Sequence, residues 1–329
     1  MSRRYIITTM EKYLITGFSG FVSRHFCEYL ERNKVNAFIK GIDVHEHDLN
    51  FDDYKYLTFD FEKIDLLSGN DIEQVLCDFQ PNFILHLASY SSVAFSWKAP
   101  IISFNNNTNI FLNILEAIRK LKLDTRILSI GSSEEYGNIR EGNLPLREDT
   151  PLNPTSPYAV ARVSQELLSK VYVKGYGLDI VLTRSFNHIG PVQKDIFVIA
   201  SFAKQLMMIK KSNSSDGNLI TGDVSIIRDF SDVRDVVIAY HLLLHSGKKG
   251  EIYNVCSGKG VSLREVISTM ADILNIKIKI AIDETLIRPD ENKKIIGCNE
   301  KLKRSLGWNP QYTLKQSLCD TLNYWDRIL

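Results

Sequence analysis

The sequence contains no apolar run that approaches the roughly 18 residues needed to cross a bilayer, so we expect no membrane association. Its 40 basic and 39 acidic residues leave a net charge of +1, without the cationic excess of surfaces that bind nucleic acids. Only five cysteines occur, and no two form a Cys-x-x-Cys pair. Because they are scattered and odd in number, they predict free thiols in a reducing compartment, and thus a cytoplasmic protein. Internal repeats and low-complexity segments are also lacking, and we expect no metal site.

The composition and the order of predicted elements indicate the fold class. The 329 residues, of which 44% are apolar and 24% charged, suffice for two domains or one large one. Strand-like apolar segments alternate with helical patterns, which predicts a Rossmann-like, doubly wound parallel sheet with a smaller α/β domain after it. We predict the first domain at residues 10–184, with a return segment near 231–256, and the second at 185–230 and 257–329.

A turn containing glycines follows the first predicted strand, at residues 12–16, and leads into a helical pattern. Gly17 and Gly20 would let the chain turn tightly and bring the first helical amides, of Phe21 and Val22, against a pyrophosphate. The next residue, a serine, replaces the third glycine that is usual in such turns, and it is small enough to keep helix and strand in contact. In this context the motif predicts a dinucleotide site.

The second predicted strand, at residues 37–43, ends in an acid. At this distance from the glycines, Asp43 is expected to hold the adenosine ribose hydroxyls. A carboxylate there would repel a 2′-phosphate. The sequence therefore predicts NAD as the cofactor, with NADP disfavoured.

Two further strands are predicted to complete the cofactor site. The third is expected at residues 61–66, and its end would lie beside the adenine. The fourth, at residues 82–88, is almost continuously apolar, as a parallel strand buried on both faces would be. Its histidine is expected to be a core residue. The cofactor contacts predicted from these two strands are Asp65, Leu66, Leu87 and Ala88.

A tyrosine and a cation are predicted one helical turn apart. Tyr158 and Arg162 lie at positions i and i+4 of a helix predicted at residues 158–174, so phenol and guanidinium share one face. Free tyrosine titrates at about 10 and is a poor base unless a close positive charge favours the phenolate. The pair predicts an activated phenol, although the same spacing also occurs in helices without a catalytic role.

Hydroxyl and carboxyl side chains follow another buried strand, predicted at residues 127–130. Ser132, Ser133 and Glu134 come directly after it, at the edge where the catalytic groups of open α/β sheets gather. We predict that these three side chains are catalytic together with Tyr158 and Arg162.

Several short motifs occur along the chain in a fixed order: Thr16-Gly17-x-x-Gly20, Asp43, His86-Leu87-Ala88, Ser132 with Tyr136-Gly137, Tyr158-x-x-x-Arg162, Asn187-His188-Ile189-Gly190-Pro191, Arg228-Asp229-Phe230 and Arg288-Pro289. Together they resemble an extended short-chain dehydrogenase/reductase that acts on nucleotide sugars. The chain is most similar to the branch of GDP-mannose 4,6-dehydratases and GDP-4-keto-6-deoxy-mannose reductases, and the resemblance covers residue 12 to the C-terminus.

The resemblance implies roles for the catalytic residues. Tyr158 would remove a proton from a sugar hydroxyl while a hydride passes to the nicotinamide, and Ser132 would hydrogen-bond the same oxygen. Arg162 would hold the nicotinamide ribose and favour the phenolate. The family normally has lysine at this position, and a planar guanidinium is not equivalent to an ammonium. Either the neighbouring groups have adapted to arginine, or activity is low or altered.

The resemblance also implies a GDP-sugar substrate. The side chains expected to bind its pyrophosphate and nucleoside are Asn187, Arg228, Arg288 and Glu291, since a guanidinium suits a phosphate bidentately. Ion pairing within the protein is the alternative role for Arg228, and simple surface exposure is the alternative for Arg288.

Three classes of reaction share this scaffold. A 4,6-dehydratase needs a carboxylate for the C5 proton, a position that Glu134 matches by resemblance, and Asp43 favours an NAD that is recycled within each turnover. A 4-keto reductase needs only the tyrosine and reduced cofactor, and some reductases of the branch carry a similar Ser-Ser-Glu-Glu-Tyr-Gly run. An epimerase or C4 dehydrogenase needs no carboxylate. We predict the dehydratase, which would supply a 4-keto-6-deoxy sugar nucleotide for surface glycan synthesis, with the others as alternatives.

An alternative hypothesis is that the protein binds its ligand without catalysing a reaction. Ser23 and Arg162 both depart from the usual pattern, so the chain could hold NAD or a nucleotide sugar as a sensor without turnover. The helices predicted at 102–121 and 158–174 are apolar enough to predict a homodimer, with a tetramer as the alternative.

Overall fold

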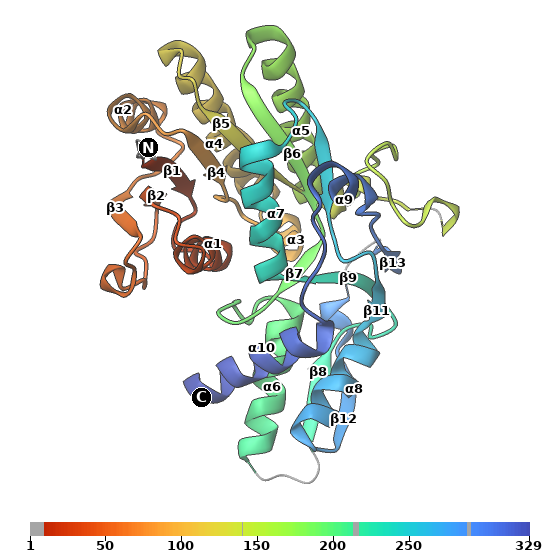
Figure 1. Ribbon diagram of the computed structural model, residues 1–329. Helices are drawn as coiled ribbons and strands as arrows, with labels where there is room; N and C mark the ends of the chain where they lie inside the picture. The colour runs from red at the N-terminus through yellow and green to blue at the C-terminus, as the bar shows by residue number, and fades with distance from the viewer. Residues whose placement is uncertain (1–9, 140, 213–216, 288–290) are drawn as a thin grey trace, which may run out of the picture.

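The computed structural model describes residues 10–139, 141–212, 217–287 and 291–329. A large parallel sheet with helices on both faces lies beside a smaller α/β part (Figure 1). The large sheet has the spatial order β3-β2-β1-β4-β5-β6-β10. Its strands are β1 (Glu11–Thr16), β2 (Ala37–Asp43), β3 (Leu57–Lys63), β4 (Phe83–His86), β5 (Arg126–Ser132), β6 (Asp179–Ser185) and β10 (Ile252–Val255). The order reverses direction between β1 and β4, which is the switch point where ligands bind in open α/β sheets. The predicted doubly wound parallel sheet is confirmed.

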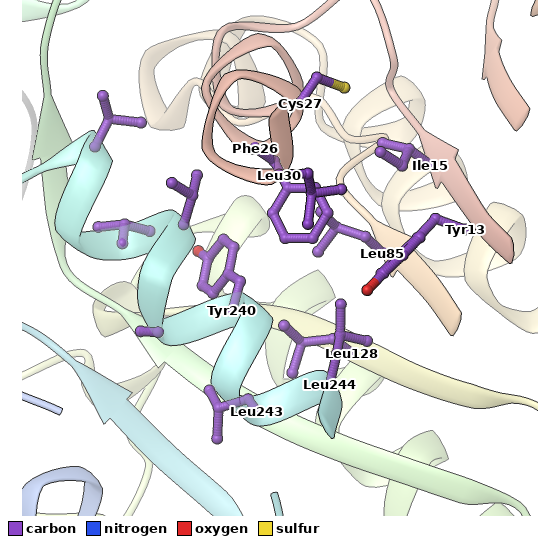
Figure 2. Close-up of a cluster of buried hydrophobic side chains, with 14 of the residues drawn as sticks. Tyr13, Ile15, Phe26, Cys27, Leu30, Leu85, Leu128, Tyr240, Leu243 and Leu244 are labelled. Atoms are coloured by element: carbon purple, nitrogen blue, oxygen red, sulfur yellow. The ribbon is translucent and has the colours of Figure 1, made fainter. Parts of the chain in front are cut away.

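The two faces of the sheet carry separate apolar cores. Because side chains alternate along a strand, Tyr13 and Ile15 of β1 point to one face and Leu14 to the other. The first face packs against α1 (Phe21–Arg32) and α7 (Val233–Ser246), as Figure 2 shows for part of this core. The second face packs against α2 (Gly69–Phe79), α4 (Pro100–Leu121) and α5 (Pro157–Tyr176).

The third strand lies earlier in the chain than the sequence pattern predicted. It spans Leu57–Lys63 at the edge of the sheet, not 61–66, because it alternates apolar and polar side chains as a strand with one solvated face does. Asp65 and Leu66 therefore follow the strand. The Asp65 Oδ1 atom accepts a hydrogen bond from the Leu67 amide at 2.9 Å, and Leu66 is buried.

The smaller part contains the remaining strands and most of the later helices. The strands β7 (Asn187–Ile189), β9 (Ile227–Asp232), β11 (Gly260–Ser262) and β13 (Lys294–Ile295) form one sheet, and β8 (Gly217–Thr221) pairs with β12 (Ile278–Ile282). A third apolar core lies among α6 (Val198–Lys211), α8 (Leu263–Leu274) and α10 (Leu314–Ile328).

Two connections in this region bear on the predicted domain division, which stays a prediction. The expected return segment contributes α7 and β10 to the large sheet. Leu302 of α9 (Glu300–Leu306) and Trp308 also pack into the first core, although the division assigned them to the second domain. Within the described ranges, no helix combines the length and apolar character that a membrane crossing requires.

Candidate active site

The turn between β1 and α1 is built for close approach of another backbone. Gly17 has φ +70°, and a Cβ there would lie 2.8 Å from the Ala88 nitrogen and 2.9 Å from the Leu87 carbonyl carbon. Only glycine fits this position, and it brings the end of β4 directly beneath the turn. Gly20 is the N-cap of α1 and makes no side-chain cap, so the amides of the first helical turn, including those of Phe21 and Val22, face the carboxyl edge of the sheet.

The serine that replaces the third glycine fits the helix–strand contact. Ser23 is fully buried, and its Oγ atom has no hydrogen-bond partner in the described part of the chain. A buried hydroxyl without a partner costs free energy but adds little volume. The helix therefore packs closely despite the substitution.

Asp43 lies at the end of β2 with its carboxylate turned toward the glycine turn. Its Oδ2 atom accepts hydrogen bonds from the Ser19 amide at 3.0 Å and the Ser19 hydroxyl at 2.7 Å. Its Oδ1 atom accepts one from the His45 amide at 3.0 Å. These bonds fix the carboxylate beside the first turn of α1, where it was predicted to meet a ribose.

Ser132, Ser133 and Glu134 lie together where β5 ends and the 3-10 helix η2 (Ser133–Tyr136) begins. The Ser132 Oγ atom accepts a hydrogen bond from the Glu134 amide at 3.2 Å, and the Ser132 amide donates to Glu135 Oε1 at 2.6 Å. This reciprocal capping box fixes the turn. Ser133 is buried, whereas Glu134 is half-exposed, and in the described ranges its carboxylate makes no hydrogen bond or ion pair.

Tyr158 and Arg162 lie near the start of α5, which packs against both β5 and η2. The helix begins at Ser156, whose hydroxyl accepts a hydrogen bond from the Ala159 amide, with Pro157 in the first turn. Tyr158 is 6% exposed and Arg162 is 4% exposed. The Arg162 guanidinium carbon lies 5.2 Å from the centre of the Tyr158 ring, so the predicted pair of phenol and cation is present.

The groups around Arg162 accommodate a guanidinium. Its Nη1 atom donates to the Ile130 carbonyl at 3.1 Å and to Gln165 Oε1 at 2.6 Å. Gln165 in turn donates to Ser129 Oγ at 2.9 Å. The Nε atom is buried, and no described residue accepts its hydrogen bond. The arginine is thus held by a defined polar shell and retains one donor.

His86 is a core residue, as expected. Its Nδ1 atom lies 2.8 Å from the Thr16 hydroxyl, and burial, together with the charge of Arg162, lowers the pKa of His86 to about 3. The ring is therefore neutral. Its Nε2 atom has no partner among the described residues.

A buried charged cluster beside the catalytic turn was not predicted from the sequence. Arg184 of β6 donates to Glu166 of α5 through Nε at 2.9 Å and Nη2 at 3.0 Å, and Glu135 Oε2 lies 4.0 Å from the same Nε. One signal was available, because Arg184 follows the apolar residues 180–182 of a strand that is buried over nearly all of its length, and an arginine there needs an acidic partner.

The structure brings together two of the residues predicted to bind the substrate. Arg228 Nη2 donates to Glu291 Oε1 at 3.1 Å, and Nη1 donates to the Asn292 carbonyl at 2.8 Å. Asn187 lies in β7, which pairs with β9 next to Arg228. Arg288 lies outside the described residues. A pocket of about 340 Å³ adjoins this region and is lined by Asn138, Ile139, Leu144, Glu291, Asn292, Lys293 and Lys294.

Comparison with known proteins places the chain among sugar-nucleotide enzymes. It is 34% identical to GDP-6-deoxy-D-mannose reductase of Pseudomonas aeruginosa over 316 residues, which cover 96% of this chain and 97% of the relative. It is 28% identical to GDP-mannose 4,6-dehydratase of Vibrio cholerae serotype O1, with 84% and 79% coverage.

Solved structures show the same fold. The P. aeruginosa protein RMD, in complex with NADPH, matches with a TM-score of 0.84 and 32% identity over 97% of this chain and all of its own. The UDP-glucose 4-epimerase of Thermus thermophilus, in complex with NAD, matches with a TM-score of 0.85 and 27% identity, with the same coverage. The family model for GDP-mannose 4,6-dehydratase matches residues 14–321. The chain therefore belongs to the GDP-mannose 4,6-dehydratase family, within the extended short-chain dehydrogenases/reductases.

Proposed function

We propose that the protein is an NAD-dependent 4,6-dehydratase of a GDP-hexose. The observation that carries this proposal is the carboxylate of Glu134, which lies half-exposed beside Ser132 without an ion-pair or hydrogen-bond partner in the described ranges. An acid with a purely structural role at a strand end would be expected to pair with a nearby cation. An unpaired acid next to the catalytic hydroxyl is what removal of the sugar's C5 proton requires.

The residues around the β1–α1 turn fit a dinucleotide. Glycine at position 17 lets the turn lie directly against the backbone of Leu87 and Ala88, and the uncapped amides at the start of α1 suit a pyrophosphate. Bound there, NAD would supply reversible hydride transfer to and from the sugar.

The charges near Asp43 favour NAD over NADP. The carboxylate would accept hydrogen bonds from two ribose hydroxyls and would repel a 2′-phosphate. Two cations that could otherwise attract that phosphate are already paired. Arg24 binds Asp48, and Lys63 lies 3.7 Å from Glu46.

The side chains then divide the chemistry between them. Tyr158 takes the proton of the C4 hydroxyl as that carbon is oxidised to a ketone, with Ser132 donating a hydrogen bond to the same oxygen. Arg162 places a positive charge beside the Tyr158 ring and would hold the nicotinamide ribose. Glu134 takes the C5 proton and passes it to the C6 hydroxyl, which leaves as water, and the proton that Tyr158 took from the C4 hydroxyl returns to C5. The hydride that C6 gains would be the one that bound NAD had accepted from C4. The net change is loss of one water.

The nucleotide end of the substrate is assigned to the smaller part of the molecule. We propose Asn187, Arg228, Arg288 and Glu291 as its contacts. The proposal of GDP rests on the names of the relatives, which include both a GDP-mannose dehydratase and a GDP-6-deoxy-mannose reductase. Arg228 now binds Glu291, so binding of a pyrophosphate would require the guanidinium to share or exchange this partner.

Reduction of a GDP-4-keto-6-deoxy-hexose at C4 is the second candidate. It is favoured by the P. aeruginosa reductase, which is 34% identical and matches over 97% of its own length. This reaction uses Tyr158 and Ser132 as above, with the phenol giving its proton to the new hydroxyl, and leaves Glu134 without a chemical role.

Mass analysis of reaction mixtures separates these candidates. The purified protein is incubated with GDP-hexoses, first without added reductant. Loss of one water supports the dehydratase, whereas gain of two hydrogens on a 4-keto sugar with added NADH or NADPH supports the reductase. Absence of any change with every sugar, in protein that retains NAD(H), would leave only a binding role.

We also propose a cytoplasmic homodimer formed through α4 and α5. These helices pack against each other, and together they expose Ile101, Val160, Leu167 and Val171, each at least 42% exposed. Such an unpartnered apolar face is typical of a protein–protein interface. Light scattering at micromolar concentration should give the mass of a dimer, or of a tetramer if a second face also associates, and Leu167→Glu with Val171→Glu should give a monomer.

A further inference from the structure

Glu135 follows the proposed base, Glu134, directly in the chain, but its environment is entirely different. It is 0% exposed, and its Oε1 atom accepts the Ser132 amide at 2.6 Å. Its Oε2 atom is buried without a hydrogen-bond partner in the part of the chain that the structure describes. A buried carboxylate that receives one hydrogen bond is poorly stabilised as an anion.

The cation nearest Glu135 is Arg184, and it forms its ion pair with a different acid, Glu166. Arg184 forms a bidentate pair with Glu166, and its Nη1 atom donates to the Glu148 carbonyl at 3.1 Å. Glu166 also accepts a hydrogen bond from Lys170 at 2.7 Å. Burial, and then the negative charge of Glu166, raise the pKa of Glu135 well above its usual range.

In Glu166, by contrast, the ionised carboxylate is stabilised. Burial disfavours ionisation of this carboxyl, but the hydrogen bonds from Arg184 and Lys170 outweigh that effect and lower its pKa. The groups that face Glu135 from α5 and β6 are therefore an anion and the cations that neutralise it. Tyr136 lies in the same turn as Glu135, and the centre of its ring is 4.8 Å from the guanidinium carbon of Arg184.

The residues around the Glu135 side chain are packed closely against it. A Cβ at Gly131 would lie 2.3 Å from Glu135 Oε1 and 2.4 Å from the Thr183 carbonyl oxygen. The side chain is thus confined between β5, β6 and α5, and any change in its bond to Ser132 is transmitted to the catalytic turn.

We propose that Glu135 is a positioning residue that, as the neutral acid, holds the backbone of Ser132 and with it the placement of the Ser132 and Glu134 side chains. This inference rests on the proposed function, because the roles of Ser132 and Glu134 come from there. Glu135 is fully buried, so its effect on the reaction would pass through Ser132. The Oε1 atom of its side-chain carboxyl group accepts a hydrogen bond from the Ser132 amide. Because the carboxyl group carries a proton, the cluster needs no second cation to neutralise it.

The first test uses no substrate. In ¹⁵N-labelled protein, the Ser132 amide resonance, identified by its loss in Ser132→Ala, is followed from pH 5 to 9. We expect it to titrate with an apparent pKa well above that of an ordinary glutamate, and to stay constant in Glu135→Gln, whose amide oxygen keeps the bond without ionising. A Ser132 resonance that is still shifting at pH 5 and is constant above about pH 6, as an ordinary glutamate would produce, would overturn the neutral-acid assignment, whatever reaction the protein catalyses.

The second test measures turnover of whichever sugar nucleotide is accepted. Glu135→Ala should lower kcat at least tenfold with little change in KM, and Glu135→Gln should restore most of that loss and alter the alkaline limb of the pH profile. Asp235→Asn is the matched control, since Asp235 is also a buried acid with a raised pKa that accepts two backbone amides, but in α7. It should change stability and leave the shape of the pH profile intact. Equal kcat losses in the Ala and Gln variants, or a profile unchanged in Glu135→Gln, would contradict positioning by a neutral acid.

Discussion

The two ends of the large sheet differ in how their polar side chains are paired. At the amino end, Tyr13 donates to Glu11 at 2.6 Å, and Glu11 lies 3.2 Å from His245. At the carboxyl end, the described residues leave buried polar atoms of Ser23, His86, Glu135 and Arg162 without partners, whereas near the amino end the corresponding atoms are Asp179 Oδ1 and His241 Nδ1. Orphaned polar groups cost stability, so a fold retains them where a ligand or a reaction uses them. The group at the carboxyl end surrounds Ser132, Tyr158 and the β1–α1 turn, and so coincides with the candidate site.

The largest effect is expected when the phenol at the carboxyl end is removed. Tyr158→Phe keeps the ring packing but deletes the acid–base group, so kcat should fall by about 10²- to 10⁴-fold. Bound NAD(H), read from absorbance of the purified variant, should be retained. Turnover within threefold of the parent would mean that another group moves the proton.

Substitution of the unpaired acid separates the two candidate reactions. With Glu134→Gln, dehydration should fall by about 10²-fold or more, while exchange of the C4 hydrogen with labelled cofactor survives. For a reductase, the same variant should reduce its 4-keto substrate at nearly the parental rate. Equal loss of exchange and dehydration would remove Glu134 from the role of base.

A smaller effect is expected at the cation. Arg162→Lys restores the usual residue but loses the hydrogen bonds from the guanidinium to Ile130 and Gln165. We expect kcat to remain within about tenfold of the parent, because the charge near the phenol is kept. The double variant Arg162→Lys with Gln165→Ala also removes the Gln165 amide, and so tests whether the polar groups around residue 162 contribute to activity. A lysine variant with no activity would show that the site is built around the guanidinium.

The smallest effect is expected at the amino end, where Glu11, Tyr13 and His245 are already paired. Burial disfavours the charged form of His245, but its hydrogen bond to Glu11 outweighs this and raises the pKa of His245. The pair's stabilisation is therefore complete below the unfolded pKa, at about 6.5, and is lost as pH rises through the folded one. His245→Gln should lower Tm by about 1–2 °C at pH 6, since such a partly exposed pair contributes at most about 1 kcal/mol.

The control for this experiment is the same comparison above neutrality. At pH 9 the parent and His245→Gln should differ by less than at pH 6, and kcat should be the same in both at either pH. A difference in Tm that grows with rising pH would contradict the assigned sign.

The sequence predicted those features that depend on local pattern. Buried parallel strands such as β2 and β4 are apolar over most of their length, and the glycines of the first turn are followed at once by a helix, so both could be placed without a structure. The third strand was misplaced because an edge strand with one solvated face reads as a weak alternating pattern. Glu135 and Glu134 are neighbours of identical type, and only the packing of α5 and β6 separates a buried acid from an available one.

The attachment of Trp308 to α7 has a practical consequence. Its indole Nε1 donates to the Asp235 carbonyl at 3.0 Å, and the Asp235 carboxylate receives the amides of Gln311 and Tyr312. A fragment ending near residue 256 would keep all seven strands of the large sheet yet uncover the side of α7 on which this segment rests. Engineers who seek a minimal cofactor-binding module from this chain would need to retain residues 300–312, or replace the contacts they make.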